Sequence, residues 1–156
     1  DPDRYLAGSV LKLRGEVSYR QGMKVGVLRD KDTLPKEPFV VTAARYRMTP
    51  PIGDSGIALF RGLKDLTEIS LSEVDITAHT ACFLRSIPNL ESLDLQTTPF
   101  DDLTLEGLVE MKQLKKLKIG GGRLTPETVR AFHAARPDCA LTIDGQPAAA
   151  WLRSRK

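Results

Sequence analysis

The chain contains few of the residues that cross-link small proteins or bind metals. Two cysteines and two histidines occur among its 156 residues. Cys82 and Cys139 are too few for a disulfide framework, and we expect both to be reduced, buried thiols. His79 and Cys82 are three residues apart, a spacing that can chelate a metal on a helix, but a closed zinc site needs four ligands and no third or fourth accompanies them. We therefore expect no metal and no cofactor.

Long apolar runs and a strong excess of one charge are also missing. No run reaches the roughly 18 apolar residues of a membrane-spanning helix, and Asp1-Pro2-Asp3-Arg4 does not open a signal peptide. The 23 basic residues are nearly balanced by 20 acidic ones, for a net charge of +3, whereas nucleic-acid binders usually gather basic residues on one face. We expect neither a membrane nor a nucleic acid as a partner. The compartment stays open, with the cytoplasm slightly favoured.

The second half of the chain is periodic. Apolar residues recur at four positions of each repeat, in the order L-x-x-L-x-L followed by a further apolar residue. The four series are Leu66, Leu90 and Leu114; Ile69, Leu93, Leu117 and Leu141; Leu71, Leu95, Ile119 and Ile143; and Ile76, Phe100 and Leu124. A constant period of about 24 residues with this core is the signature of a leucine-rich repeat, in which short strands alternate with helices.

The repeat predicts where the strands and helices lie. Strands are expected at 68–72, 92–96, 116–120 and 140–143, after a degenerate first strand at 39–46. The helices begin at equivalent capping residues, Thr77, Asp101 and Thr125, and Pro88 and Pro137 end two of them. Three apolar sets, three residues apart, are expected to face the sheet. They are Ile57, Ala81, Leu105 and Val129; Phe60, Leu84, Leu108 and Phe132; and Leu63, Ile87, Met111 and Ala135.

Different elements are expected at the two ends. Residues 1–14 read as a helix that Gly15 stops in the usual position after the C-cap, and 16–28 as a hairpin that turns at Gly22. A loop at 30–38 completes an N-terminal capping segment, 1–38. The repeats, about four in number, then occupy 39–144. Residues 145–156 form a C-terminal cap and tail, in which Trp151 packs over the last repeat.

The repeats resemble those of leucine-rich-repeat proteins of the ribonuclease-inhibitor-like and cysteine-containing types. The resemblance lies in Leu66-Thr67-Glu68-Ile69-Ser70-Leu71, Leu90-Glu91-Ser92-Leu93-Asp94-Leu95 and Leu114-Lys115-Lys116-Leu117-Lys118-Ile119. More narrowly, they are similar to repeat domains of large planctomycete-type bacterial proteins. The resemblance implies an α/β solenoid with a parallel sheet on the concave face and helices on the convex face, and it implies protein–protein interaction.

The sequence departs from this family at one buried turn position. Many members carry Asn, Thr or Cys there, and the side chain bonds the neighbouring backbone. This chain has Val74, Thr98 and Gly122 at the equivalent places. We therefore expect only Thr98 to make such a bond, with backbone or water satisfying the other groups.

Two short motifs resemble catalytic sequences but have plainer explanations. Gly53-Asp54-Ser55-Gly56 matches the sequence around a chymotrypsin-type nucleophile. The register puts His79 and His133 one and three repeats away, however, and a triad needs its base within hydrogen-bond reach. Gly120-Gly121-Gly122 follows a strand, as in phosphate-binding loops, but lacks the lysine of a P-loop, so we expect a tight turn. We expect no enzymatic activity.

The concave face of the sheet is the predicted binding site. Side chains alternate along a strand, so the residues between the leucines point outward. The predicted partner-binding residues are Arg45, Arg47, Glu68, Ser70, Ser72, Ser92, Asp94, Gln96, Lys116 and Lys118. Because aromatic anchors are missing from this set, we expect a weak or charge-steered contact with a protein, or a partner on the convex side or at an end. The alternative is that the face is only solvated.

The sequence therefore predicts a non-catalytic protein–protein interaction module. The alternative is a structural or regulatory appendage of a larger multidomain protein, for example a signalling kinase, since the chain starts at Asp1 rather than Met. The last strand, 140–143, is expected to be an edge strand that can pair with a second copy and give a homodimer.

Overall fold

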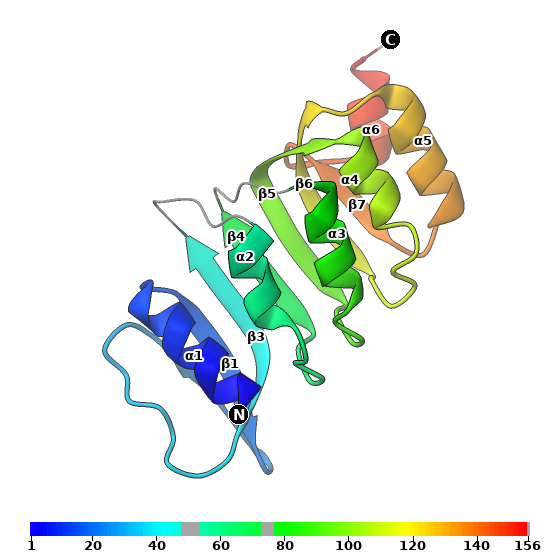
Figure 1. Cartoon of the computed structure of the whole chain (residues 1–156). Helices are drawn as coiled ribbons and strands as arrows, with labels where there is room; N and C mark the ends of the chain where they lie inside the picture. Colours follow the sequence, from blue (N-terminus) through cyan, green and yellow to red (C-terminus); the bar gives the residue numbers. More distant parts are fainter. Residues whose placement is uncertain (48–53, 73–76, 156) are drawn as a thin grey trace.

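The computed structural model describes residues 1–47, 54–72 and 77–155 (Figure 1). Within them, eight strands form one sheet in the order β2-β1-β3-β4-β5-β6-β7-β8. Their bounds are β1 (Glu16–Gln21), β2 (Lys24–Leu28), β3 (Val40–Arg47), β4 (Glu68–Ser72), β5 (Ser92–Asp101), β6 (Lys116–Arg123), β7 (Ala140–Ile143) and β8 (Gln146–Pro147). Strands β3 to β7 are parallel, and both ends of the sheet are antiparallel.

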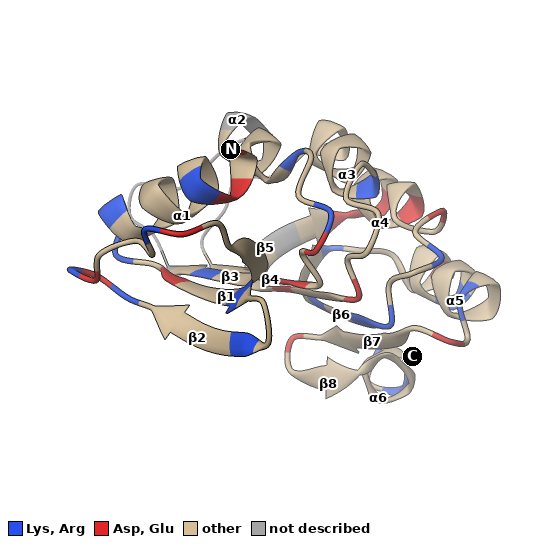
Figure 2. Cartoon of the chain, turned by 90° about the horizontal axis from the view of Figure 1, so that it is seen from below, with Lys and Arg blue, Asp and Glu red and all other residues tan. Residues whose placement is uncertain are grey.

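Helix α1 precedes the strands, and each strand from β3 to β6 is followed by a helix. Helices α1 to α5 lie along one face of the sheet (Figure 2). The helices are α1 (Pro2–Lys12), α2 (Asp54–Ile57), the 3-10 helix η1 (Ala58–Phe60), α3 (Ala78–Arg85), α4 (Asp102–Gly107), α5 (Pro126–Ala135) and α6 (Ala148–Arg153). No helix of the described segments combines the length and apolar character that crossing a bilayer requires.

The expected leucine-rich-repeat solenoid with a parallel sheet and a separate cap is wrong: the chain is α/β with one open, mixed sheet. The N-terminal hairpin enters that sheet, because β1 pairs antiparallel with β3 from Glu16 opposite Arg45 to Arg20 opposite Val40. This pairing occupies backbone groups of β3 that would otherwise need other partners. Helix α1, the hairpin of β1 and β2, and the C-terminal helix α6 also share one hydrophobic core with the repeats, which runs from Leu6 to Trp151.

The parallel strands pair at the interval of the sequence repeat. Ile69 lies opposite Leu93, Leu93 opposite Leu117, and Leu117 opposite Leu141. The first three are at most 1% exposed. In the fourth predicted series, Phe100 and Leu124 are buried, while Ile76 lies outside the described residues, as does Val74. The predicted limits of 68–72 and 140–143 are confirmed, whereas β5 and β6 extend beyond the predicted strands.

The predicted helix caps are confirmed. The side chain of Thr77 accepts a hydrogen bond from the backbone N–H of His79, and Asp101 and Thr125 accept from the N–H groups of Thr104 and Thr128. The hydroxyl and backbone N–H of Thr104 both donate to Asp101 and hold the pKa of that carboxyl below its usual value. These bonds satisfy donors that a helix N-terminus leaves without an intrahelical partner.

Two predictions about glycine are wrong. Arg14, with φ of 56°, takes the left-handed position after α1, while the N–H of the next residue, Gly15, bonds the carbonyl of Val10. Gly15 is required instead by space, because a Cβ there would lie 2.8 Å from the carbonyl oxygen of Arg45. The segment 120–122 is part of β6 rather than a turn. A Cβ at Gly120 would lie 2.7 Å from the carbonyl oxygen of Thr98.

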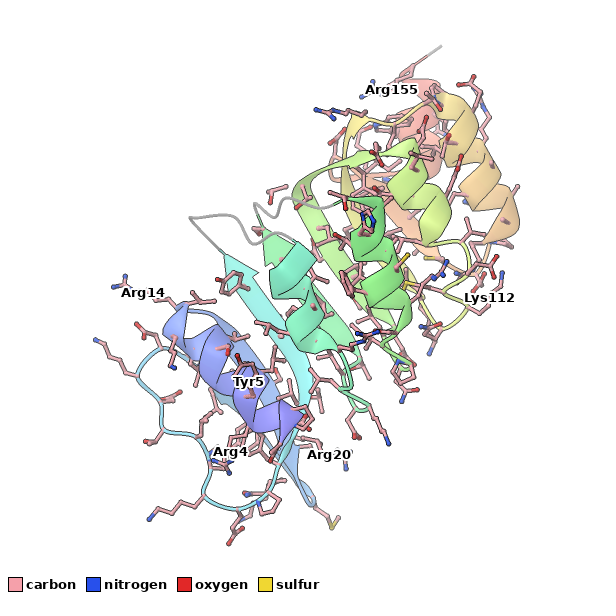
Figure 3. The ribbon with its side chains drawn as sticks, in the orientation of Figure 1. Arg4, Tyr5, Arg14, Arg20, Lys112 and Arg155 are labelled. Atoms are coloured by element: carbon pink, nitrogen blue, oxygen red, sulfur yellow. The ribbon has the colours of Figure 1, made fainter. Side chains whose placement is uncertain are left out.

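The ends of the chain are fixed by polar contacts as well as by the core. Arg4 lies against the loop at 30–38 (Figure 3) and donates to the carbonyl of Pro35 at 2.6 Å. At the other end, Asp144 accepts from the N–H of Gly121 at 2.9 Å and from the indole of Trp151 at 3.3 Å. Trp151 is 2% exposed, so its predicted packing at the C-terminal end is confirmed.

The last strand of the parallel set is not the edge strand that the sequence predicts. Thr142 and Ile143 of β7 pair with Pro147 and Gln146 of β8. Because β8 has two residues and includes a proline, which has no N–H, this end of the sheet offers little backbone for a further strand. Among the described strands, β2 forms the other end of the sheet.

The helix-facing sets are buried as predicted, with one exception. Ala135 is exposed, and the next residue, Arg136, is buried instead, at 1% exposure. Its guanidinium donates to the carbonyls of Met111 at 2.5 Å and Leu114 at 2.6 Å, and to the carboxylate of Asp138 at 2.9 Å. Arg136 therefore ties the end of α5 to the loop before β6.

Replacing Arg136 tests this link. We expect Arg136→Met to lower the free energy of unfolding by at least about 2 kcal/mol, because buried carbonyls lose their donors while the apolar volume is roughly kept. Urea unfolding followed by circular dichroism measures this change. Arg130→Met, at an exposed position of the same helix, is the matched control and should stay within about 0.5 kcal/mol of the parent. Equal effects of the two substitutions would contradict the proposed link.

Candidate functional site

The candidate site is the face of the sheet opposite α1 to α5, which we call the open face. No described helix lies across it between β1 and β6 (Figure 2). Its side chains come from alternate residues of each strand. They are Glu16 and Ser18; Val25 and Val27; Arg45; Glu68, Ser70 and Ser72; Ser92, Asp94 and Gln96; Lys116 and Lys118; and Thr142.

Strand pairing brings the predicted binding residues together in two rows. One row runs Arg45, Ser70, Asp94 and Lys118, each opposite the next, and Thr142, which is not among the predicted residues, follows opposite Lys118. The second row, listed by strand from β4 to β6, is Glu68, Ser92 and Lys116. The backbone of Arg47, in β3, lies opposite the backbone of Ser72, in β4. The side chain of Arg47 lies outside the described part of the structure.

Four charged residues of alternating sign form a chain at the β1, β3 and β4 end of the open face. Arg45 donates to Glu68 at 2.8 Å and to Glu16 at 3.2 Å, and Glu16 also pairs with Arg29 at 2.8 Å. The hydrogen bond to Glu68, followed by the charge of Glu68, raises the pKa of Arg45. Because the side chain of Arg45 is 52% exposed, these contacts orient the charges more than they stabilise the fold.

The β5 and β6 end of the face has its own pairs. Asp94 lies 3.3 Å from the ammonium group of Lys118, and Lys115 lies 2.8 Å from Glu91 where these strands begin. Lys116 is exposed on the same face. The face thus carries both signs, with basic groups on β3 and β6 and acidic groups on β1, β4 and β5, a pattern that a surface of complementary charge can match.

Strand β5 has extra residues relative to β6 between Leu95 and Pro99, beside the open-face residue Gln96. The pairing of β5 with β6 shifts register between Leu95 and Pro99, and the N–H of Gln96 bonds the carboxylate of Asp94 at 3.2 Å. The amide of Gln96 reaches toward Gly145, since a Cβ at Gly145 would lie 3.3 Å from its Nε2. Thr98, in the same strand, is buried at this irregularity. The bond from its side chain to the neighbouring backbone stays a prediction.

The sequence predictions missed two residues of the charged chain. Glu16 and Arg29 join it because β1 pairs with β3, whereas the sequence predicts the hairpin only as a cap. The alternation of residues 16 to 19 was the available signal, since it gives Glu16 and Ser18 a common face. The sequence did not indicate which strand β1 would pair with, so the neighbours of Glu16 and Ser18 could not be predicted.

The remaining chemical candidates lie apart from the open face. His79 and Cys82 are both exposed on α3, which corrects the expectation of a buried Cys82. Gly53 and the side chains of Asp54 and Ser55 lie outside the described residues. Within the described segments, no three His, Cys, Asp or Glu residues gather as a metal-binding group.

No protein-family model matches the chain, and no curated protein matches it.

The two cysteines should differ in reactivity. Burial raises the pKa of Cys139 to about 11, so it stays a thiol at pH 8, whereas Cys82 is exposed. Since the thiolate is the reactive form, we expect iodoacetamide to label native protein once, at Cys82, and denatured protein twice. Mass spectrometry of intact protein and of its peptides measures this. Two rapid labels in the native state would contradict the burial of Cys139.

The charges of the open face should be nearly dispensable for folding. Arg45→Gln removes ion pairs to Glu16 and Glu68, but we expect it to change the free energy of unfolding by less than about 1 kcal/mol, because exposed pairs are well solvated. The comparison is made by urea unfolding at about 0.1 M and 1 M salt, where screening should shrink any difference. A larger, salt-independent loss would mean that the pairs hold the sheet together.

Proposed function

We propose that this chain is a non-catalytic protein–protein interaction module that binds a protein partner through the open face. The observation that carries the proposal is the row of side chains from Arg45 to Lys118, held in register by the backbone on the face opposite the helices. Arg45 and Lys118 are exposed, and Ser70 and Asp94 are half-buried. The sequence repeats are similar to those of leucine-rich-repeat proteins, and this similarity supports the same function. The assignment of the repeats to that family is itself part of the proposal.

The chemistry of the face favours a protein over a uniformly charged partner. Acidic and basic groups neighbour one another, as in the pairs of Arg45 with Glu68 and of Lys118 with Asp94. A polyanion would meet as many repulsive as attractive groups, while a protein surface can present the opposite sign at each position. None of the open-face residues defined above is aromatic, so the contact depends on steering and pattern more than on buried anchors.

Charge reversal on the open face tests the proposal. The triple variant Arg45→Glu, Asp94→Lys and Lys118→Glu should lose the partner that the parent chain captures from a lysate of its source. Once that partner is identified, its affinity for the variant should fall at least about tenfold, since reversed charges repel their former partners. Isothermal titration calorimetry of the purified pair gives the affinity.

A matched variant separates a site effect from a general change of charge. Arg85→Glu, Glu127→Lys and Arg130→Glu changes the net charge by the same amount at exposed positions of α3 and α5. This helix variant should bind as the parent does. Equal binding by the open-face variant would contradict the proposed site. If neither parent nor helix variant captures a partner, the alternative gains support, in which the chain acts within a larger protein.

A further inference from the structure

The free end of the sheet is apolar and uncovered. Among the described strands, β2 pairs with β1 alone, and it stands at the opposite end of the strand order from β8. Val25 is 79% exposed and Val27 is 42% exposed, and Met23 in the adjoining turn is fully exposed. Edge strands of folded proteins are usually blunted by charges, proline or bulges. Strand β2 has one charged residue, Lys24, and its pairing with β1 is regular.

The backbone of β2 offers hydrogen bonds at the same residues. The two-residue turn at Gly22 and Met23 sets Gln21 opposite Lys24, and the residues that flank such a turn form a hydrogen-bonded pair. Opposed residues then alternate between bonded and non-bonded pairs. Val25 and Val27 therefore direct their N–H and C=O groups away from β1, toward the free edge.

The sequence of β2 is also complementary to itself. It reads Val25-Gly26-Val27 about a central glycine. If two copies pair antiparallel about Gly26, Val25 of one lies opposite Val27 of the other. Both residues have outward backbone groups, so each such pair forms two hydrogen bonds, and four valine side chains meet on one face of the joined sheet.

Charge does not oppose this register. Lys24 is the one charged residue of β2, and pairing about Gly26 places it opposite Leu28 of the second copy. No like charges of the two strands therefore face each other.

We propose that β2 is a self-association edge, through which two copies of this chain pair antiparallel about Gly26 and join their sheets. The occupant of the edge is a second copy, because the strand matches itself in side chains and backbone and brings no like charges into opposition. Val25 and Val27 belong to the open face, but the proposal does not depend on the row from Arg45 to Lys118 that carries the binding function. The interface is a single strand pair, so the dimer is weak and forms with rising concentration.

Proline at Val25 provides the first test. The N–H of Val25 points away from β1, so Val25→Pro removes a donor of the dimer while sparing the hairpin. Val25→Thr keeps the donor and the branched shape and is the matched control. We expect sedimentation velocity, over concentrations up to about 1 mM, to show the weight-average mass of the parent and of Val25→Thr rising toward twice the monomer. Val25→Pro should remain monomeric, with an unchanged circular dichroism spectrum.

A distance measurement tests the register without altering β2. Met23 is replaced by a spin-labelled cysteine in a Cys82→Ser background, where Cys139 is buried and is not labelled. Pairing about Gly26 puts the two Cα atoms of residue 23 about 20 Å apart, as the rise along the intervening strand requires. Pulsed electron paramagnetic resonance reads this distance. If Val25→Pro does not fold, this measurement alone decides.

Three results would overturn the proposal. They are a parent chain that stays monomeric at every concentration, a dimer that persists in folded Val25→Pro, and a label separation that differs clearly from the one expected for pairing about Gly26. The open-face triple variant should dimerise as the parent does, which keeps failure of this proposal separate from failure of the binding function.

Discussion

Backbone pairing at the interval of the sequence repeat constrains the positions of most other residues. From β4 to β7, the paired residues of neighbouring strands occupy equivalent places in successive repeats, so every connection must cross one helix and return at the same level of the sheet. A parallel connection of this kind turns in one hand, which keeps the connecting helices on one face. Ile69, Leu93 and Leu117 then stack beneath them, and the residues between are presented on the other face. The core and the open face are two results of one register.

Elements that repeat could be predicted from the sequence, because each is specified locally. The capping residues Thr77, Asp101 and Thr125 sit at helix starts as expected, since a short polar side chain beside a free N–H is sufficient. Features set by contact with distant segments could not be predicted. Gly120 is required by the carbonyl of Thr98, and Arg136 is buried because carbonyls of the preceding loop lie within reach of its guanidinium.

The ends of the sheet show the same limit on a larger scale. The hairpin itself was predictable from alternation and Gly22, but its strand partner was not, since β1 and β3 are separated in the chain by the whole of β2 and the loop that follows it. The predicted parallel sheet is therefore mixed. Glu16 joins the open face, and Arg29 pairs with it, without a signal in the repeats. The positions of the predicted site residues on β4 to β6 followed directly from alternation along strands whose register the repeat had specified.

The charges of the open face are already paired with one another, and this determines how a partner can be recognised. Arg45 contacts Glu68 and Glu16, and Asp94 contacts Lys118, so a partner must exchange these contacts for its own. The exchange costs little, because exposed ion pairs stabilise the fold weakly. It rewards a surface whose charges oppose those of the face in the same order from strand to strand, at a spacing of about 4.8 Å, since a mismatch leaves like charges opposed. The face therefore discriminates by the order of its charges rather than by their sum, and binding should weaken as salt screens that order.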